Sequence, residues 1–100
     1  MRADVPHGVQ CAQLIHAAGS SSPGDLPEGT VAVALAVANE EALVRLELRL
    51  QDRGVPHKAV REPDPPYNGA LLAIGVFPGP RSVLRRFFRG LSLIGVSDED

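Results

Sequence analysis

The segment Ala70-Leu71-Leu72-Ala73-Ile74-Gly75-Val76 has no polar side chain on either face of a strand. A second segment, Val31–Ala38, alternates larger apolar residues with alanine and is equally free of polar residues. Strands with one face in water alternate apolar and polar residues, whereas strands apolar on both faces are covered on both. The period of two also favours a strand over a helix at 31–38. Both segments therefore predict buried strands between helices.

Helical periodicity surrounds these two strands. Pro6 to Ala18 predicts a first helix, with Gly19 just past its end. Asn39 is a typical N-cap, and the helix that it opens is expected to end near Gly54. A last helix is expected after residues 78–80. The core stripes predicted on the three helices are Cys11, Leu14, Ile15 and Ala18; Leu43, Leu46 and Leu50; and Leu84, Phe87, Phe88 and Leu91.

A further strand, about His57 to Glu62, precedes a proline-rich loop at 63–69. Alternating strands and helices with doubly buried strands predict an α/β domain of three layers, α/β/α, around a small mixed sheet. The length of 100 residues fits one domain, which we place at 1–96 with an acidic tail at 97–100. Only three strands are visible, which is few for a sheet covered on both faces.

Composition excludes several classes of protein. The single cysteine, Cys11, cannot form an internal disulfide, which argues against a stapled secreted scaffold. No apolar run approaches the roughly 20 residues of a membrane helix, and no secretory signal opens the chain. We therefore expect a cytoplasmic protein without a membrane partner. The formal net charge is −2, and leaving out the three acidic residues at 98–100 brings the rest to +1.

The most informative motif is Ala12-Gln13-Leu14-Ile15-His16-Ala17 on the first helix, preceded by Arg2, Asp4 and Gly8. It resembles the first helix of type 2 peptidyl-tRNA hydrolases, in which R-x-D-L and a variable link precede G-K-x-A-A-Q-x-x-H-A. The later strands and helices follow in the family's order, including Leu72-Ala73-Ile74-Gly75 and a closing Leu91-Ser92-Leu93-Ile94. The resemblance covers nearly the whole chain.

The resemblance implies hydrolysis of the ester between a peptide, or an N-blocked aminoacyl group, and tRNA, without a metal or another cofactor. His16 would carry the proton, because an imidazole titrates near neutral pH. Backbone N–H groups where the first helix opens would hold the oxyanion beside it. The further catalytic candidates are Gln13, Asp4 and Asp64, and the candidates for substrate binding on the first helix and the loop are Gly8, Tyr67 and Asn68.

The sequence also departs from the family. The family's helix lysine is Val9, the threonine before L-A-I-G is Ala70, and the D-A-G-x-T loop appears as residues 62–67 without Gly or Thr. The nearest likeness is to a divergent branch without the helix lysine. The family's first strand, central in its four-stranded sheet, is short or absent here. We expect residues upstream of Met1 or a second copy in a homodimer to fill that place.

Each candidate also has a structural interpretation. His16 could pack against the N-terminal loop, and Gln13 could bond a neighbouring backbone group. Asp4 could be the N-cap of the first helix behind Pro6. Asp64 and Asn68 are residues that any turn favours. The residues alone leave both interpretations open.

Arginines supply the remaining signal. Arg81, Arg85 and Arg89 recur every four residues on the last helix, with Arg86 beside them and no acidic residue among them. Such a row predicts contacts with tRNA phosphates. The row Arg45, Arg49 and Arg53 has acidic neighbours and predicts an ordinary solvated face. Two classes of function stay open: a peptidyl-tRNA hydrolase acting in translation, or a non-catalytic module of that fold that binds RNA, a peptide or a partner protein.

Overall fold

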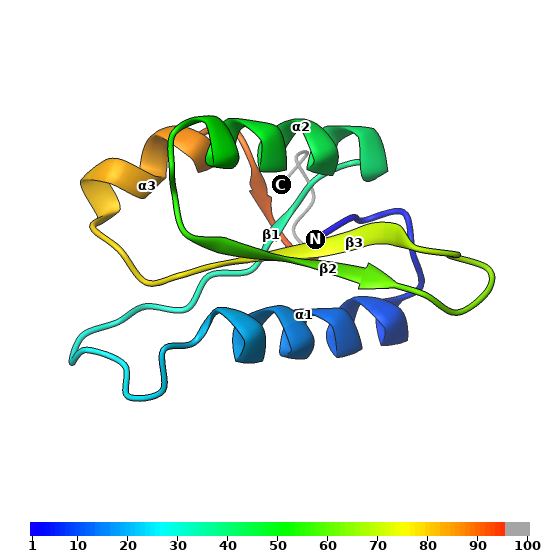
Figure 1. Cartoon of the computed structure of the whole chain (residues 1–100), viewed down its shortest axis with the longest axis horizontal. Coiled ribbons are helices and arrows are strands. Elements are labelled where there is room, and N and C mark those ends of the chain that lie inside the picture. Colours follow the sequence, from blue (N-terminus) through cyan, green and yellow to red (C-terminus); the bar gives the residue numbers. More distant parts are fainter. Residues whose placement is uncertain (96–100) are drawn as a thin grey trace.

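Strands and helices form three layers in a computed structural model, which describes residues 1–95 (Figure 1). One helix, α1, covers one face of the strands, and α2 and α3 cover the other. The three-layer α/β/α class is thereby confirmed, and the acidic tail predicted at 97–100 lies outside the described residues. The elements in order are α1 (His7–Ser21), β1 (Leu35–Ala36), α2 (Glu40–Asp52), β2 (His57–Glu62), β3 (Ala70–Val76), α3 (Arg81–Phe88) and β4 (Ser92–Leu93).

The strand layer consists of two antiparallel pairs, β2 with β3 and β1 with β4. Residues 1–3 lie between the pairs and join them. The Arg2 N–H donates to Leu72 O at 3.1 Å, and the Val37 N–H donates to Met1 O at 3.0 Å. Arg2 and Val37 pair in parallel, so the layer is mixed.

The strand predicted at 31–38 is much shorter in the structure, where only Leu35–Ala36 and the bridge at Val37 are paired. Val31 and Val33 are exposed, so the expectation that this segment is covered on both faces is wrong. Its neighbours on both sides reach only this far along the chain. Ala34 O accepts from the Ile94 N–H at 3.0 Å, next to β4, and Leu35 O accepts from the Met1 ammonium at 3.1 Å. A strand needs a partner's backbone as well as apolar side chains.

The strand β3 is buried as its sequence predicts. Leu71 and Leu72 are both fully buried, and their side chains lie on opposite faces of the strand. Leu72 packs with Met1, Val5 and Ala17 on the side of α1, whereas Leu71 packs with residues of α2. One apolar strand therefore supplies both halves of the core.

The second helix and the last helix bury the predicted residues. Asn39 caps α2 by accepting a hydrogen bond from the Ala42 N–H at 3.0 Å. Leu43 and Leu50 are fully buried on α2, and Phe87 is buried on α3. The remaining predicted core residues of these two segments are half-buried: Leu46, Leu84, Phe88 and Leu91.

The first helix is rotated relative to the prediction. Its buried residues are Gln10, Gln13, Ala17 and Ser21, whereas Ile15 is 71% exposed and Cys11 is exposed. The stripe of Cys11, Leu14, Ile15 and Ala18 is therefore wrong, except for the half-buried Leu14. Two contacts explain the rotation. The Gln10 amide donates to Val5 O at 2.8 Å, and the backbone of Ala17 lies directly over Gly75.

The buried N-terminus makes stability depend on pH. Burial lowers the pKa of the Met1 ammonium from 8.0 to about 6. Between these values the unfolded chain holds a proton that the folded chain has lost, so the free energy of unfolding rises as the pH rises. We expect a gain of about 2 kcal/mol from pH 6 to pH 8. Urea denaturation measures it, with the N-acetylated chain as control. The same pH dependence in both chains would contradict the prediction.

Candidate functional site

Gln13 joins α1 to the end of β2. Its side-chain amide Nε2 donates to Glu62 Oε2 at 3.1 Å, and its Oε1 lies 3.3 Å from Nδ1 of His16. Gln13 is only 5% exposed, so the amide is fixed between two partners. A helix places residues three positions apart on neighbouring parts of one face, which explains the contact with His16. Glu62 comes from 49 positions further along the chain.

The direction of these bonds sets the tautomer of His16. The Glu62 carboxylate accepts hydrogen bonds, so the Gln13 NH₂ group faces it and the amide oxygen faces the imidazole. That oxygen can only accept, so the proton of a neutral imidazole sits on Nδ1. The lone pair on Nε2 is then free, and His16 is exposed. The arrangement therefore presents a proton acceptor to solvent.

Glu62 was not among the residues predicted for the site. Its second oxygen, Oε1, accepts from the backbone N–H of Asp64 at 3.1 Å. The carboxylate thus holds both Gln13 and the start of the loop at 63–69. The available signal was that Glu62 is the single acidic residue in the predicted strand at 57–62.

The predicted loop residues lie beside Glu62. The backbone carbonyl of Asp64 accepts from the N–H groups of Tyr67 and Asn68, at 3.0 and 3.3 Å. Tyr67 is half-buried and packs against the core on the side of α1. Asn68 has a φ of 48°, a left-handed conformation that asparagine tolerates in turns. Glu62 therefore links the start of this loop to the Gln13–His16 pair.

Asp4 does not contact His16. Its carboxylate accepts two hydrogen bonds from the Arg2 guanidinium, at 2.8 and 2.9 Å. The hydrogen bond from Arg2 lowers the pKa of Asp4. The alternative that Asp4 caps the helix is wrong, because Pro6 occupies the N-cap position and no side chain caps it.

The start of α1 is also distant from His16. The helix begins at His7, nine positions earlier, and a rise of 1.5 Å per residue puts roughly 13 Å between them. The expected oxyanion site beside His16 at the helix start is therefore wrong. Gly8 is exposed in the first turn, where it could contact only a part of a substrate remote from His16.

The helix α3, which carries three of the predicted arginines and is directly followed by Arg89, lies on the other side of the strands from α1 (Figure 1). Arg81, Arg85, Arg86 and Arg89 are all exposed. Arg85 and Arg89 line a hollow together with Leu35 and Phe88. The arginines predicted to bind phosphate and the predicted catalytic histidine therefore belong to different layers and do not form one site.

Comparison with known proteins identifies no relatives. The chain matches no family model, and no curated protein or solved structure is similar to it at a significant level. Among residues 1–95, no three His, Cys, Asp or Glu side chains are placed to hold a metal ion. In the same range no helix is both long enough and apolar enough to cross a membrane.

Proposed function

We propose that the protein hydrolyses the ester between a peptide, or an N-blocked aminoacyl group, and tRNA, in the cytoplasm. The observation that carries the proposal is the line of contacts Glu62–Gln13–His16, with the free Nε2 at its exposed end. The likeness of the A-Q-x-x-H-A motif to the first helix of type 2 peptidyl-tRNA hydrolases supplies the substrate. The domain class agrees with that likeness.

In the proposed reaction His16 acts as a general base. Its Nε2 takes a proton from a water molecule, and the water oxygen attacks the ester carbonyl carbon. The carbon–oxygen bond to the ribose then breaks, and the imidazolium returns the proton to the ribose oxygen. Gln13 holds the imidazole in the required tautomer, and Glu62 holds Gln13. In this role Gln13 and Glu62 are positioning residues.

The remaining predicted residues have roles at the border of this site. Asp64, Tyr67 and Asn68 lie on the loop that Glu62 anchors, and we assign them to contacts with the substrate. Asp4, which is paired with Arg2, would help to fix the N-terminal residues rather than the imidazole. The helix that carries the predicted arginines, α3, lies on the opposite side of the strands from α1, so these arginines do not orient the ester at His16.

One observation favours a second function: α3, which carries the predicted arginines, lies on the opposite side of the strands from α1, which carries His16 (Figure 1). A surface that binds a partner need not lie near any catalytic group. A non-catalytic module of this fold that binds RNA, a peptide or a partner protein therefore stays a candidate.

The two functions predict different results for the whole chain with peptidyl-tRNA. If the protein is a hydrolase, we expect purified protein to release free tRNA from N-acetyl-aminoacyl-tRNA well above the rate in buffer. The measurement is acid-precipitable label against time. Release no faster than in buffer would contradict the hydrolase. Salt-sensitive retention of tRNA without turnover would then support the module.

A further inference from the structure

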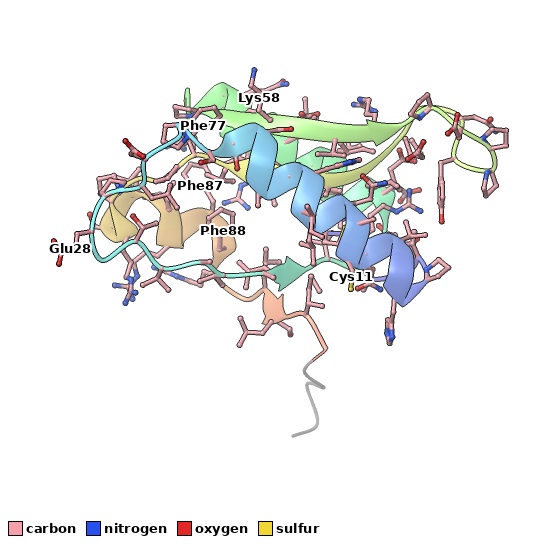
Figure 2. The ribbon with its side chains drawn as sticks, turned by 90° about the horizontal axis from the view of Figure 1, so that it is seen from below. Cys11, Glu28, Lys58, Phe77, Phe87 and Phe88 are labelled. Atoms are coloured by element: carbon pink, nitrogen blue, oxygen red, sulfur yellow. The ribbon has the colours of Figure 1, made fainter. Side chains whose placement is uncertain are left out.

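Two adjoining hollows, both shallow and open to solvent, lie on the side of the strands that α2 and α3 cover. One has a volume of about 320 Å³ and contains Leu35, Arg85, Phe88 and Arg89. The other has a volume of about 220 Å³ and lies where α2 and α3 meet. Arg89 borders both, so we treat the two hollows together and call them the basic groove. Phe87 and Phe88 of α3, labelled in Figure 2, both line it.

The rim of the basic groove is cationic and uncompensated. It carries four exposed arginines: Arg45 and Arg49 from α2, Arg85 from α3, and Arg89 directly after α3. None of the four forms an ion pair with an acidic residue of the described range 1–95. The sequence assigned Arg45 and Arg49 to an ordinary solvated face, whereas in the structure they face a hollow. Four like charges around one depression favour an anionic ligand.

The floor of the basic groove is apolar. It is formed by Val37 and Phe87, which are 8% and 5% exposed, and by the half-buried Leu46 and Leu91. Arg49 lies 5.6 Å from the centroid of the Phe87 ring, and its Nη2 donates to Arg86 O at 3.4 Å. This arginine is therefore held in place at the rim. An occupant that fits both surfaces combines carboxylates with aliphatic side chains.

The state of the aromatic rings favours a polypeptide over RNA as the occupant of the basic groove. Single-stranded RNA is bound by stacking its bases on open aromatic faces. Phe87 is buried, and Arg49 already lies over its ring. Phe88, the other aromatic residue of the groove, is half-buried. Neither ring is therefore a fully open face for stacking.

We propose that the basic groove docks an acidic segment of a partner protein, with aliphatic side chains on the apolar floor and carboxylates on Arg45, Arg49, Arg85 and Arg89. This interaction surface is separate from the ester-cleaving site on α1 and does not depend on it. The half-buried Leu46 and Leu91 supply most of the apolar surface that aliphatic side chains of the partner would cover, and removing that surface from water provides affinity. The arginines select acidic segments and set their direction.

The test uses a fluorescein-labelled synthetic peptide of alternating Asp and Leu residues, with fluorescence polarisation as the readout. The full chain is expected to bind this peptide. Two matched peptides, one with Lys in place of Asp and one with Ser in place of Leu, should bind at least about tenfold more weakly than the Asp/Leu peptide. The double variant Arg45→Glu/Arg89→Glu is expected to lose about tenfold or more in affinity.

The matched control is Arg53→Glu/Arg81→Glu, which changes the net charge by the same amount. Arg53 directly follows α2 and Arg81 is the first residue of α3, and neither lines the basic groove. It should stay within about twofold of the wild type. The variant His16→Ala should bind the peptide as the wild type does, which separates this proposal from the hydrolase. Circular dichroism confirms that each variant is folded.

Three outcomes would overturn the proposal. The first is no measurable binding of the Asp/Leu peptide, and the second is equal loss of affinity in the groove variant and the control variant. The third is tighter binding of a single-stranded RNA oligonucleotide than of the peptide, with the same dependence on Arg45 and Arg89. That result would identify the basic groove as a nucleic-acid surface.

Discussion

Gly75→Ala is expected to destabilise the protein by about 3 kcal/mol or more, because α1 and β3 are in contact at this glycine. A Cβ at position 75 would overlap the backbone carbonyl oxygen of Ala17 and would lie 2.7 Å from Ser21 Oγ. The obstacle is helix backbone, which cannot rotate aside as a side chain does. The methyl group could be accommodated only if α1 lifted away from β3, which would open the core around Leu72.

Thermal unfolding followed by circular dichroism measures this effect. A loss of about 3 kcal/mol corresponds to a fall in Tm of more than about 12 °C for a domain of this size. The control is Gly19→Ala on α1, where a Cβ meets nothing within 4 Å. Alanine there should be neutral or slightly stabilising. The added variant Ser21→Ala should not rescue Gly75→Ala, because the Ala17 carbonyl remains in the way. A wild-type Tm for Gly75→Ala would mean that α1 does not pack here.

This contact also shows why part of the fold could be predicted and part could not. The burial of β3 and α2 follows from their own residues, since a strand without polar residues and a capped amphipathic helix leave little choice. The orientation of α1 depends instead on Gly75, which is far away in the sequence. Hydrophobicity alone favours Ile15 as a core residue, whereas close approach over Gly75 selects Ala17, and hydrogen bonds then satisfy the buried Gln10 and Gln13.

The candidate site, like the fold, could be predicted from the sequence only in part. Gln13 and His16 are three positions apart, so helical geometry alone indicates that they touch. Glu62 could not be found in this way, because its contact with Gln13 depends on how α1 lies across the end of β2. Nor does the sequence state on which side of the strands a helix packs. This is why the arginines of α3 were grouped with His16, although the structure separates them.

Replacement of His16 is expected to have the largest effect on the proposed reaction. The variant His16→Ala removes the free Nε2, and loss of a general base lowers rates by roughly 10²- to 10⁴-fold. The variant Gln13→Leu keeps the imidazole but removes the acceptor for its Nδ1 proton, so a smaller loss is expected. We place it at about tenfold, in line with the effect of partners that orient a histidine.

The assay is release of tRNA from N-acetyl-aminoacyl-tRNA under single-turnover conditions, which isolates the chemical step from product release. The matched control is His7→Ala, which removes an exposed imidazole from the first turn of the same helix. It should stay within about twofold of the wild type, since His7 lies roughly 13 Å along α1 from His16. Equal losses in His7→Ala and His16→Ala would point to a general effect of α1. A fully active His16→Ala would remove His16 from the mechanism. Among residues 1–95, His16 is the one proton acceptor that the Glu62–Gln13 pair orients, so the hydrolase proposal would then be wrong as well.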